Sequence, residues 1–421
     1  MALFETEEKE VNIKQEYGEK LLDDTRNLLE PCHYHNFFDE NFLSESDVLD
    51  FLHSIQTEKA SANVRVFIDQ GRRADYEDGF FKCSINKEDT VTSWVKRLFK
   101  DHKFGIVIGQ AEQFNDKVAQ KCAQFFEPIF QKVGLPLGGA TITFFIGNYG
   151  FTPFGVHKDM EEKSIFHFHI GPGKKEMYLW NESDYKEATG TTGSFFEPDK
   201  IVEKAKKYTI LPYDLFHLPA SYYHIGYTDE LSIGMALVLI DITNKKLTEE
   251  AIRIMYNEVF NYKTTYRLQN DIFSTNNDFH LEHIYPTHRI SNYQTNTLSE
   301  WVESSASDWR LAKLSNFGFN NAPPMDTTVE LNISDKKIQA IRPFNIYSRI
   351  ESQEIMAIFV RNQKIIVRNH PAFPAMLEKI NSGSPIDVAE LIKPLLDVWK
   401  EEDALNLISL ILRNHGVTVV S

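Results

Sequence analysis

The fold is decided by the stretch of sequence that runs from Gly150-Phe-Thr-Pro-Phe-Gly-Val-His157-Lys-Asp159 to Tyr213-Asp-Leu-Phe-His-Leu-Pro-Ala-Ser-Tyr-Tyr-His224-Ile225. A β-rich run at 141–146 leads into the first of these segments, and another at 231–240 follows the second. Between residues 138 and 243, short runs of this kind are broken by Gly and Pro. Such a pattern predicts a barrel or a sandwich of short strands.

Two histidines and one aspartate in these segments are the residue types of a 2-His-1-carboxylate iron site. His157 and Asp159 are separated by one residue, so in an extended segment both side chains point the same way and can reach one ion. His224 would supply the third ligand from the other segment. In the alternative interpretation, His157 and Asp159 form a surface pair and His224 is a buried, hydrogen-bonded histidine. The two segments together, with strands between them, favour the metal site.

The composition is that of an ordinary globular chain. Its 421 residues are 42% hydrophobic and 25% charged, which suits about two or three domains. The formal net charge of −15 argues against binding to nucleic acid or to anionic membranes, and it suits a basic peptide or protein. Three scattered cysteines fit no disulfide framework, the first residues have no signal-peptide character, and no apolar run reaches the ~20 residues that cross a bilayer. We therefore expect a soluble, cytoplasmic protein.

The central stretch resembles the JmjC group of Fe(II)/2-oxoglutarate oxygenases, which have a double-stranded β-helix (cupin) fold. Within that group it is similar to the asparaginyl hydroxylase of hypoxia-inducible factor and to bacterial ribosomal-protein hydroxylases. The resemblance implies that His157, Asp159 and His224 bind Fe(II) and that 2-oxoglutarate is the cosubstrate. The segments that carry it are Phe145–Pro153, His157-x-Asp159, the expected strand 165–170, Gly173–Trp180 and Asp214–His224.

The resemblance also implies where 2-oxoglutarate binds, because its distal carboxylate needs a cation at the barrel wall. Residues 225–244, where another oxygenase class carries an Arg, contain neither Arg nor Lys. JmjC-like enzymes use a Lys on the strand after the His-x-Asp motif, and Lys175 occupies that place, with Lys174 as the adjacent alternative. Thr152 matches the residue whose hydroxyl shares the carboxylate, with two more residues before His157 than in the family pattern. In the alternative interpretation, either lysine is a solvated hairpin residue.

Two histidines follow on the expected strand 165–170, where side chains alternate between two faces. Placing Lys175 at its family position implies that His167 and His169 face inward and contact 2-oxoglutarate. Core-lining histidines and a cupin His-x-His metal pair are the alternatives. The family also has an Asn after the distal His that helps to hold the cosubstrate, and the corresponding region here offers only Ser232.

Other histidines lie outside this pattern. His280-x-Glu-His283 fits no zinc spacing well. Cys32-His33-Tyr-His35 has the composition of a ligand cluster without a partner cluster, which favours a surface loop. His217 is expected to be structural.

The C-terminal part shows a hairpin pattern followed by helices. Arg361-Asn-Gln forms the expected turn, and the last helix is expected to end with Gly416 as its C′ residue. A hairpin followed by three helices and a strand resembles a winged-helix module. The expected elements are strands 354–360, 364–368 and 417–420, helices 374–380 and 388–399, and a last helix that contains Leu405, Ile408 and Leu412.

We therefore expect an α+β chain with four regions. Residues 1–135 form an α/β flank that packs on the barrel, and residues 136–245 form the JmjC-like double-stranded β-helix that is the catalytic core. Residues 246–345 form a helical linker, through which the chain would form a homodimer as related enzymes do. Residues 346–421 form a winged-helix-like domain.

The sequence favours an Fe(II)/2-oxoglutarate-dependent oxygenase that hydroxylates a residue in a peptide or protein and converts 2-oxoglutarate to succinate and CO2. The alternatives are a metal-binding cupin that acts as an isomerase or lyase, and an inactive JmjC-like module that binds a partner. The expected iron ligands are His157, Asp159 and His224, and the expected cosubstrate residues are Lys175, Thr152 and His167.

Overall fold

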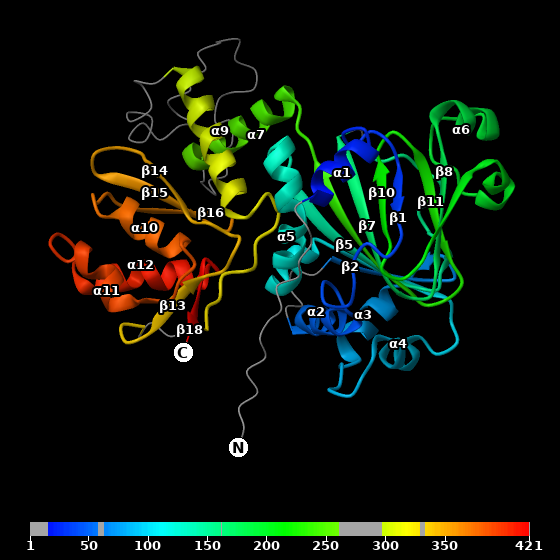
Figure 1. The fold of residues 1–421 in the computed structure, drawn as a ribbon, viewed down its shortest axis with the longest axis horizontal. Coiled ribbons are helices and arrows are strands. Elements are labelled where there is room, and N and C mark those ends of the chain that lie inside the picture. The colour runs from blue at the N-terminus through cyan, green and yellow to red at the C-terminus, as the bar shows by residue number, and fades with distance from the viewer. Residues whose placement is uncertain (1–15, 58–62, 161, 261–296, 329–332, 421) are drawn as a thin grey trace, which may run out of the picture.

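Figure 1 shows a computed structural model of the chain, which describes residues 16–57, 63–160, 162–260, 297–328 and 333–420. A larger N-terminal body contains two antiparallel sheets and several helices, and a smaller C-terminal body has its own sheets and core. This mixture of helices and large antiparallel sheets agrees with the expected α+β class.

The larger sheet runs through the whole N-terminal body, and all its neighbouring strands are antiparallel. Strands from early in the chain continue the sheet formed by the central stretch, so both regions share one layer. In sheet order the strands are β1 (Cys32–Tyr34), β10 (Leu215–Pro219), β7 (Lys163–Pro172), β12 (Ser232–Ile240), β5 (Ala140–Gly147), β4 (Phe104–Gly109), β2 (Asn63–Ile68) and β3 (Gly71–Arg72).

The two faces of the larger sheet meet different surroundings. On β5, Ile142, Phe144 and Ile146 are buried in the main core, whereas Thr143 and Phe145 line a cavity on the other side. Successive side chains of a strand point to opposite faces. The alternation on β5 therefore separates a structural face from a face that can carry chemistry.

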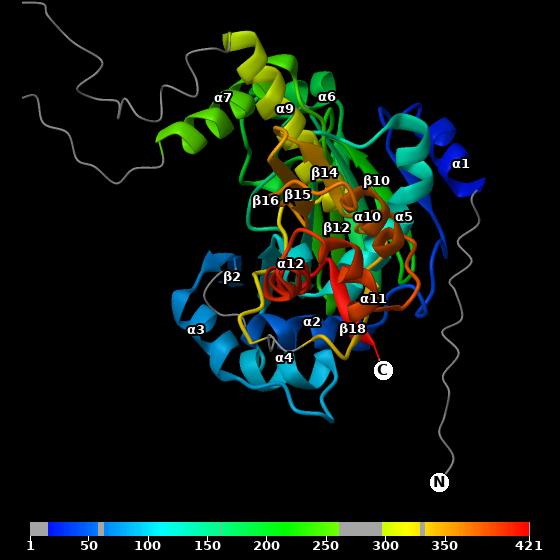
Figure 2. The ribbon, with the colours of Figure 1, turned by 90° about the vertical axis from the view of Figure 1, so that its left-hand side faces the viewer.

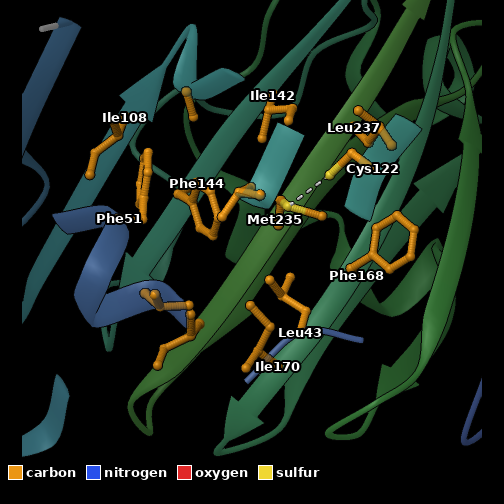
Figure 3. Packing of buried hydrophobic residues seen from close by; sticks show 14 of the residues in the cluster. Leu43, Phe51, Ile108, Cys122, Ile142, Phe144, Phe168, Ile170, Met235 and Leu237 are labelled. Carbon is orange, nitrogen blue, oxygen red and sulfur yellow. Dashed lines mark hydrogen bonds between the residues drawn. The ribbon is translucent and has the colours of Figure 1, made fainter. Parts of the chain in front are cut away.

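Helices cover the structural face and fill the core with aromatic and sulfur side chains. Figure 3 shows Phe51 of α2 beside Phe144, with ring centroids 4.4 Å apart, and Cys122 Sγ of α5 at 3.7 Å from Met235 Sδ on β12. The helices that contribute to this core are α1 (Glu16–Asp24), α2 (Glu45–Thr57), α3 (Ala74–Lys82), α4 (Val91–Phe99) and α5 (Asp116–Val133).

The smaller sheet packs against the other face of the larger one. Apolar side chains from both sheets meet between them, among them Ile165 of β7 and Met177 of the smaller sheet. Its strands, in order, are β6 (Gly150–Phe151), β11 (Tyr223–Thr228), β8 (Lys175–Trp180) and β9 (Lys206–Ile210), with α6 (Glu182–Thr189) after β8.

Two long helices connect the two bodies. Helix α7 (Asn244–Phe260) leaves the end of β12, and α9 (Leu298–Ser315) packs beside it in both views (Figures 1 and 2). Helices were expected within residues 246–345, and most of α7 and all of α9 lie there.

The C-terminal body consists of two three-stranded sheets and three helices. The hairpin expected at Arg361 is confirmed, because Arg361 and Asn362 form its turn with φ of 46° and 63°. The helix expected over 388–399 is wrong beyond Ile392, where Pro394 lacks the N–H that would continue it. The elements are β13 (Lys337–Ala340), β14 (Tyr347–Ile350), β15 (Ile355–Val360), β16 (Gln363–Arg368), α10 (Phe373–Asn381), β17 (Ile386–Asp387), α11 (Val388–Ile392), α12 (Glu401–Arg413) and β18 (Val417–Val420).

The expected role of Gly416 is also wrong. His415, with φ of 57°, takes the left-handed position after α12, and the Gly416 N–H donates to the Ile411 carbonyl at 3.0 Å. A Cβ at Gly416 would lie 2.6 Å from Val360 Cγ1. Close packing, rather than a positive φ, therefore requires the glycine.

A buried arginine ties the C-terminal body to the N-terminal one. Arg361 donates from Nη1 to Asp116 Oδ1 at 2.9 Å and from Nε to Asn316 Oδ1 at 2.7 Å. Its guanidinium carbon also lies 3.7 Å from the ring centroid of Phe344. The hairpin turn that the sequence predicts thus serves as the contact between the two bodies.

None of the helices in the described part of the chain is both long enough and apolar enough to span a membrane.

Candidate metal centre

The two ends of the central stretch meet in the structure. The segment after β6 runs antiparallel to β11, and His157 and His224 form a bridge between them. The His157 N–H donates to the His224 carbonyl at 3.2 Å, and the His224 N–H donates to the His157 carbonyl at 2.9 Å. Asp159 follows on the same segment, so the fold brings all three predicted ligands together.

The turn before His157 depends on a glycine. Gly155 has φ of 71°, and a Cβ there would lie 2.8 Å from the Phe195 carbonyl oxygen. Its carbonyl oxygen lies 2.9 Å from His157 Nδ1, so this turn also orients the imidazole.

The ligand atoms of the three side chains converge. One nitrogen of each histidine and one carboxylate oxygen of Asp159 all lie within 4.8 Å of one another. His224 Nε2 and Asp159 Oδ2 are 3.8 Å apart, and the two imidazole centroids are 4.6 Å apart. Such a donor set fits a divalent metal ion of the iron type.

Hydrogen bonds around the group leave the converging atoms free. His157 Nδ1 donates to the Gly155 carbonyl, and His224 Nδ1 lies 3.3 Å from the Tyr222 carbonyl oxygen. Both bonds select the tautomer whose Nε2 carries a lone pair. Lys163 Nζ donates to Asp159 Oδ1 at 3.0 Å and leaves Oδ2 for an ion.

The protonation states also suit metal binding. Burial lowers the pKa of His224 to about 4, so its imidazole is neutral at physiological pH. Burial alone would raise the pKa of Asp159, but the nearby His224 and Lys163 outweigh it and hold that pKa below its usual value. A neutral imidazole and an ionised carboxylate are the forms that ligate a cation.

The three ligands open into a cavity of about 350 Å³ between the two sheets. Residues from both sheets line it, including Arg65 on β2 of the larger sheet. They are Arg65, Thr143, Phe145, Thr152, Phe154, His157, Asp159, Lys163, Ile165, His167, Lys175, Met177, Leu218, His224, Gly226, Ala236 and Val238.

Lys175 points into this cavity, whereas Lys174 does not line it. The Lys175 side chain is only 2% exposed, and its Nζ lies 5.1 Å from the ring centroid of Phe145. Within the described residues it has no ion pair or hydrogen bond from Nζ, and burial lowers its pKa to about 7. Lys174 is 48% exposed and lies 4.0 Å from Glu176. Gly226 leaves room for Lys175, since a Cβ there would lie 3.0 Å from its Cε.

Thr152 and His167 line the same cavity. The Thr152 N–H donates to the Gly226 carbonyl at 2.9 Å, which places Thr152 in the wall that carries Lys175. Burial, followed by the charge of Lys175, lowers the pKa of His167 well below its usual value. This imidazole is therefore neutral beside the lysine.

His169 and Ser232 do not line the cavity. His169 Nε2 lies 2.6 Å from the Gly173 carbonyl oxygen, so it supports the turn between β7 and β8. Ser232 is buried at the start of β12. His217 Nδ1 lies 2.9 Å from the Glu30 carbonyl oxygen, outside the cavity.

The chain resembles solved structures of a bacterial ribosomal oxygenase. YcfD, a ribosomal oxygenase from Escherichia coli, in complex with cobalt and 2-oxoglutarate is 10% identical over 93% of this chain and 95% of that chain, with a TM-score of 0.49. YcfD with cobalt and succinic acid covers the same shares at 10% identity and a TM-score of 0.48, and a further E. coli YcfD structure does so at 12% and 0.48. No protein-family model matches the chain, and no curated protein matches it.

At such low identity and such modest TM-scores, the function of this chain has to be judged from its own side chains.

The surface loop expected at Cys32-His33-Tyr-His35 is wrong, because Cys32–Tyr34 form strand β1 and the two histidines join Asp214 in a cluster. His33 Nε2 and His35 Nδ1 lie 2.8 and 3.0 Å from Asp214 Oδ2. The same carboxylate accepts hydrogen bonds from the backbone N–H groups of Asn36 and Leu211. With four N–H groups around it, Asp214 is a satisfied buried carboxylate that fastens β1 to the turn before β10. Its partners meet only through the tertiary fold.

Other cavity residues were also missed, among them Arg65, Phe154 and Lys163. Arg65 offered a signal, because it is the one charged residue in the apolar run Val64-Arg-Val-Phe-Ile68. The His280-x-Glu-His283 group lies outside the described residues.

Proposed function

We propose that this protein is an Fe(II)/2-oxoglutarate-dependent oxygenase that hydroxylates an amino-acid residue in a peptide or protein substrate. One observation carries the proposal: a single cavity holds three converging ligand atoms, from His157, Asp159 and His224, together with the buried cation Lys175. The position of this cavity between two antiparallel sheets supports a double-stranded β-helix of the cupin or JmjC type as the core.

Two imidazoles and one carboxylate would hold one face of Fe(II) and leave the other face open. When bound, Fe(II) and 2-oxoglutarate supply a reaction that uses both atoms of O2. One oxygen atom oxidises 2-oxoglutarate to succinate and CO2, and the other converts a substrate C–H bond to an alcohol. The chain's own part is to keep the donor atoms in place. Lys163 does this for Asp159, and the carbonyls of Gly155 and Tyr222 do it for the two imidazoles.

Lys175 would bind the distal carboxylate of 2-oxoglutarate by a charge-assisted hydrogen bond. Its pKa of about 7 reflects burial, and a bound carboxylate would raise that pKa and favour the ammonium form. Thr152 in the same wall and the neutral imidazole of His167 would complete the pocket with uncharged polar groups.

We also propose the expected division of the chain. Residues 1–135 form the flank, 136–245 the catalytic core, 246–345 the helical linker and 346–421 the winged-helix-like domain. The separate apolar core of the C-terminal body supports the last of these. Exposed Ile252 and Tyr256 on α7 support a homodimer through the linker helices.

Succinate production tests the proposed function. Purified protein is given Fe(II), 2-oxoglutarate and air, and succinate is measured for wild type, His157→Ala, Lys175→Ala and Lys174→Ala. Wild type should form succinate only with iron, and His157→Ala should form none. Lys175→Ala should need more 2-oxoglutarate, whereas Lys174→Ala, whose side chain does not line the cavity, should match wild type.

A protein that binds metal but neither binds nor turns over 2-oxoglutarate, even with peptides present, would point to a cupin isomerase or lyase. A protein that binds neither would point to a JmjC-like module that only binds a partner. Either result would overturn the oxygenase proposal.

A further inference from the structure

Arg65 stands on the cavity side of the larger sheet. Its neighbours Val64 and Val66 are buried in the main core, so alternation along β2 turns Arg65 toward the opposite face. The guanidinium carbon lies 5.4 Å from the ring centroid of Phe154, whose ring makes an edge contact with His157 at 6.4 Å between centroids. Arg65 therefore belongs to the wall of the metal cavity.

The guanidinium of Arg65 makes no ion pair with a carboxylate among the residues that the structure describes. Its Nε is buried without a hydrogen bond, and no carboxylate pairs with it. Glu77, a carboxylate of the adjoining α3, already accepts from Arg72 Nε at 2.8 Å. Burial, and then the charge of Arg72, lowers the pKa of Arg65, and the charge of Glu77 offsets only part of this effect. A half-buried cation without a counter-ion is costly, and a bound anion would relieve that cost.

The charged residues that line the cavity include more cations than anions, so the cavity can accept such an anion. Among the described lining residues, Asp159 is the only carboxylate, and Lys163 already pairs with it. Lys175 faces the place proposed for the distal carboxylate of 2-oxoglutarate. After both have been accounted for, Arg65 is the cavity-lining cation left without a direct carboxylate partner among the described residues, and only Glu77, which is already paired with Arg72, lies near enough to offset part of its charge.

Strand register separates Arg65 from Lys175. Arg65 pairs with Val107 on β4, and Val107 pairs with Phe145 on β5, over whose ring Lys175 lies. Two strand spacings of about 4.8 Å place the Arg65 backbone about 10 Å from that of Phe145. Phe145 thus marks the 2-oxoglutarate side of the cavity, and Arg65 marks the side toward the sheet edge at β3.

We propose that Arg65 forms an anion subsite at this side of the cavity, which binds a carboxylate of the substrate to be oxidised. The inference rests on the proposed oxygenase function and narrows its substrate class. A planar guanidinium binds a carboxylate through two parallel hydrogen bonds and repels a cation. The carboxylate belongs either to an acidic side chain of a peptide or to a free acid, and a substrate with an Arg or Lys at this position is disfavoured.

Binding of defined peptides tests the subsite without turnover. Three acetylated hexapeptides differ only in one central residue, which is Asp, Asn or Arg, and free aspartate is the small-molecule probe. Dissociation constants are measured calorimetrically on the full chain loaded with Co(II) and 2-oxoglutarate in the absence of O2. The same probes are measured on metal-free Lys175→Ala protein, which lacks the lysine proposed to bind 2-oxoglutarate.

The Asp peptide should bind about tenfold or more tightly than the Asn peptide, and the Arg peptide should bind most weakly. Arg65→Gln should abolish the difference between Asp and Asn, and Arg65→Lys should retain part of it. Arg73→Gln is the matched control, because Arg73 lies on the same hairpin, is paired with Asp75 and does not line the cavity. If free aspartate binds as tightly as the Asp peptide, the natural carboxylate is that of a free acid.

Equal binding of the Asp and Asn peptides to wild type would overturn the subsite, as would a preference that survives Arg65→Gln. The proposal would also be overturned if Arg65→Gln lost 2-oxoglutarate binding while Lys175→Ala kept it. That result would show that Arg65 binds the cosubstrate rather than the substrate. Failure of Co(II) or 2-oxoglutarate to bind wild type would overturn the proposed oxygenase function but not the anion subsite. The binding measurements on the metal-free protein would still decide the role of Arg65.

Discussion

His157 and His224 are paired twice, once through their backbones and once through their rings. Mutual N–H to carbonyl hydrogen bonds of 3.2 and 2.9 Å join the two residues, and their imidazole centroids lie 4.6 Å apart. Because the backbone pairing sets the distance between the two Cα atoms, His157 is held against strand β11 of the smaller sheet, on which His224 lies. The backbone positions of the two histidines should therefore survive changes at single side chains around them.

The ion pair between Lys163 and Asp159 should raise metal affinity. Lys163→Met removes the donor that holds Asp159 Oδ1, so the carboxylate can rotate away from the ion. We expect Co(II) affinity to fall by about 10- to 100-fold, as for other changes to groups that orient a metal ligand. A Co(II) titration followed by visible absorption measures it. Lys200→Met, at an exposed residue paired with Glu197, serves as the control, and an unchanged affinity in Lys163→Met would contradict the role of the pair.

Binding of 2-oxoglutarate should weaken as pH rises. The free Lys175 ammonium has a pKa of about 7, and the bound carboxylate raises that pKa. Above pH 7 the free protein must therefore take up a proton on binding, and the dissociation constant should rise toward about tenfold per pH unit. Calorimetry from pH 6.5 to 8.5, in buffers of different ionisation enthalpy, measures both affinity and proton uptake. Lys175→Met should show a flat profile, and a flat profile in wild type would exclude Lys175 as the anion ligand.

The space that Gly226 leaves should matter for the cosubstrate more than for the metal. Gly226→Ala would place a Cβ 3.0 Å from Lys175 Cε and 3.3 Å from Met177 Sδ. Displacing the lysine should cost about 1 kcal/mol or more, which is about fivefold in the 2-oxoglutarate dissociation constant. Gly193→Ala is the control, because a Cβ there would make only an ordinary contact of 3.6 Å with Thr191 Oγ1, and it should leave the 2-oxoglutarate dissociation constant unchanged. If Gly226→Ala weakened Co(II) binding but left 2-oxoglutarate binding unchanged, Gly226 would matter for the metal rather than for the cosubstrate.

The contact between the two bodies should depend on Arg361. Arg361→Met leaves Asp116 and Asn316 without their buried donor and should lower the free energy of unfolding by about 3 kcal/mol. Chemical denaturation measures the change, with Arg368→Met on the exposed side of β16 as control. Unfolding that separates into two transitions would show that the two bodies come apart first, whereas an unchanged midpoint would show that the contact contributes little.

The cluster around Asp214 should stabilise the fold without binding a catalytic metal. Asp214→Asn removes an acceptor that serves four N–H groups and should cost about 2 kcal/mol or more of unfolding free energy. Co(II) should still bind with one ion per chain, at the His157 site. A stoichiometry of two ions in wild type that falls to one in Asp214→Asn would instead make this cluster a second metal site.

The pairing of His157 with Asp159 followed from local spacing, because a His-x-Asp pair in an extended segment must point both side chains the same way. The same alternation rule covers β5 and β2, where it assigns Phe145 and Arg65 to the cavity face once the strands are known. By contrast, Gly416 was assigned a left-handed turn, whereas its conformation is decided by contact with Val360 on a distant strand.

The sequence by itself determined that His157 and Asp159 point the same way, where strands alternate and where the C-terminal hairpin turns, since each of these depends on neighbours within a few residues. Only the tertiary structure decided that Lys175 rather than Lys174 faces the cavity, that Asp214 collects two distant histidines and that Arg65 reaches the metal cavity. These outcomes depend on strand register and burial, which are set by contacts between segments far apart in the chain.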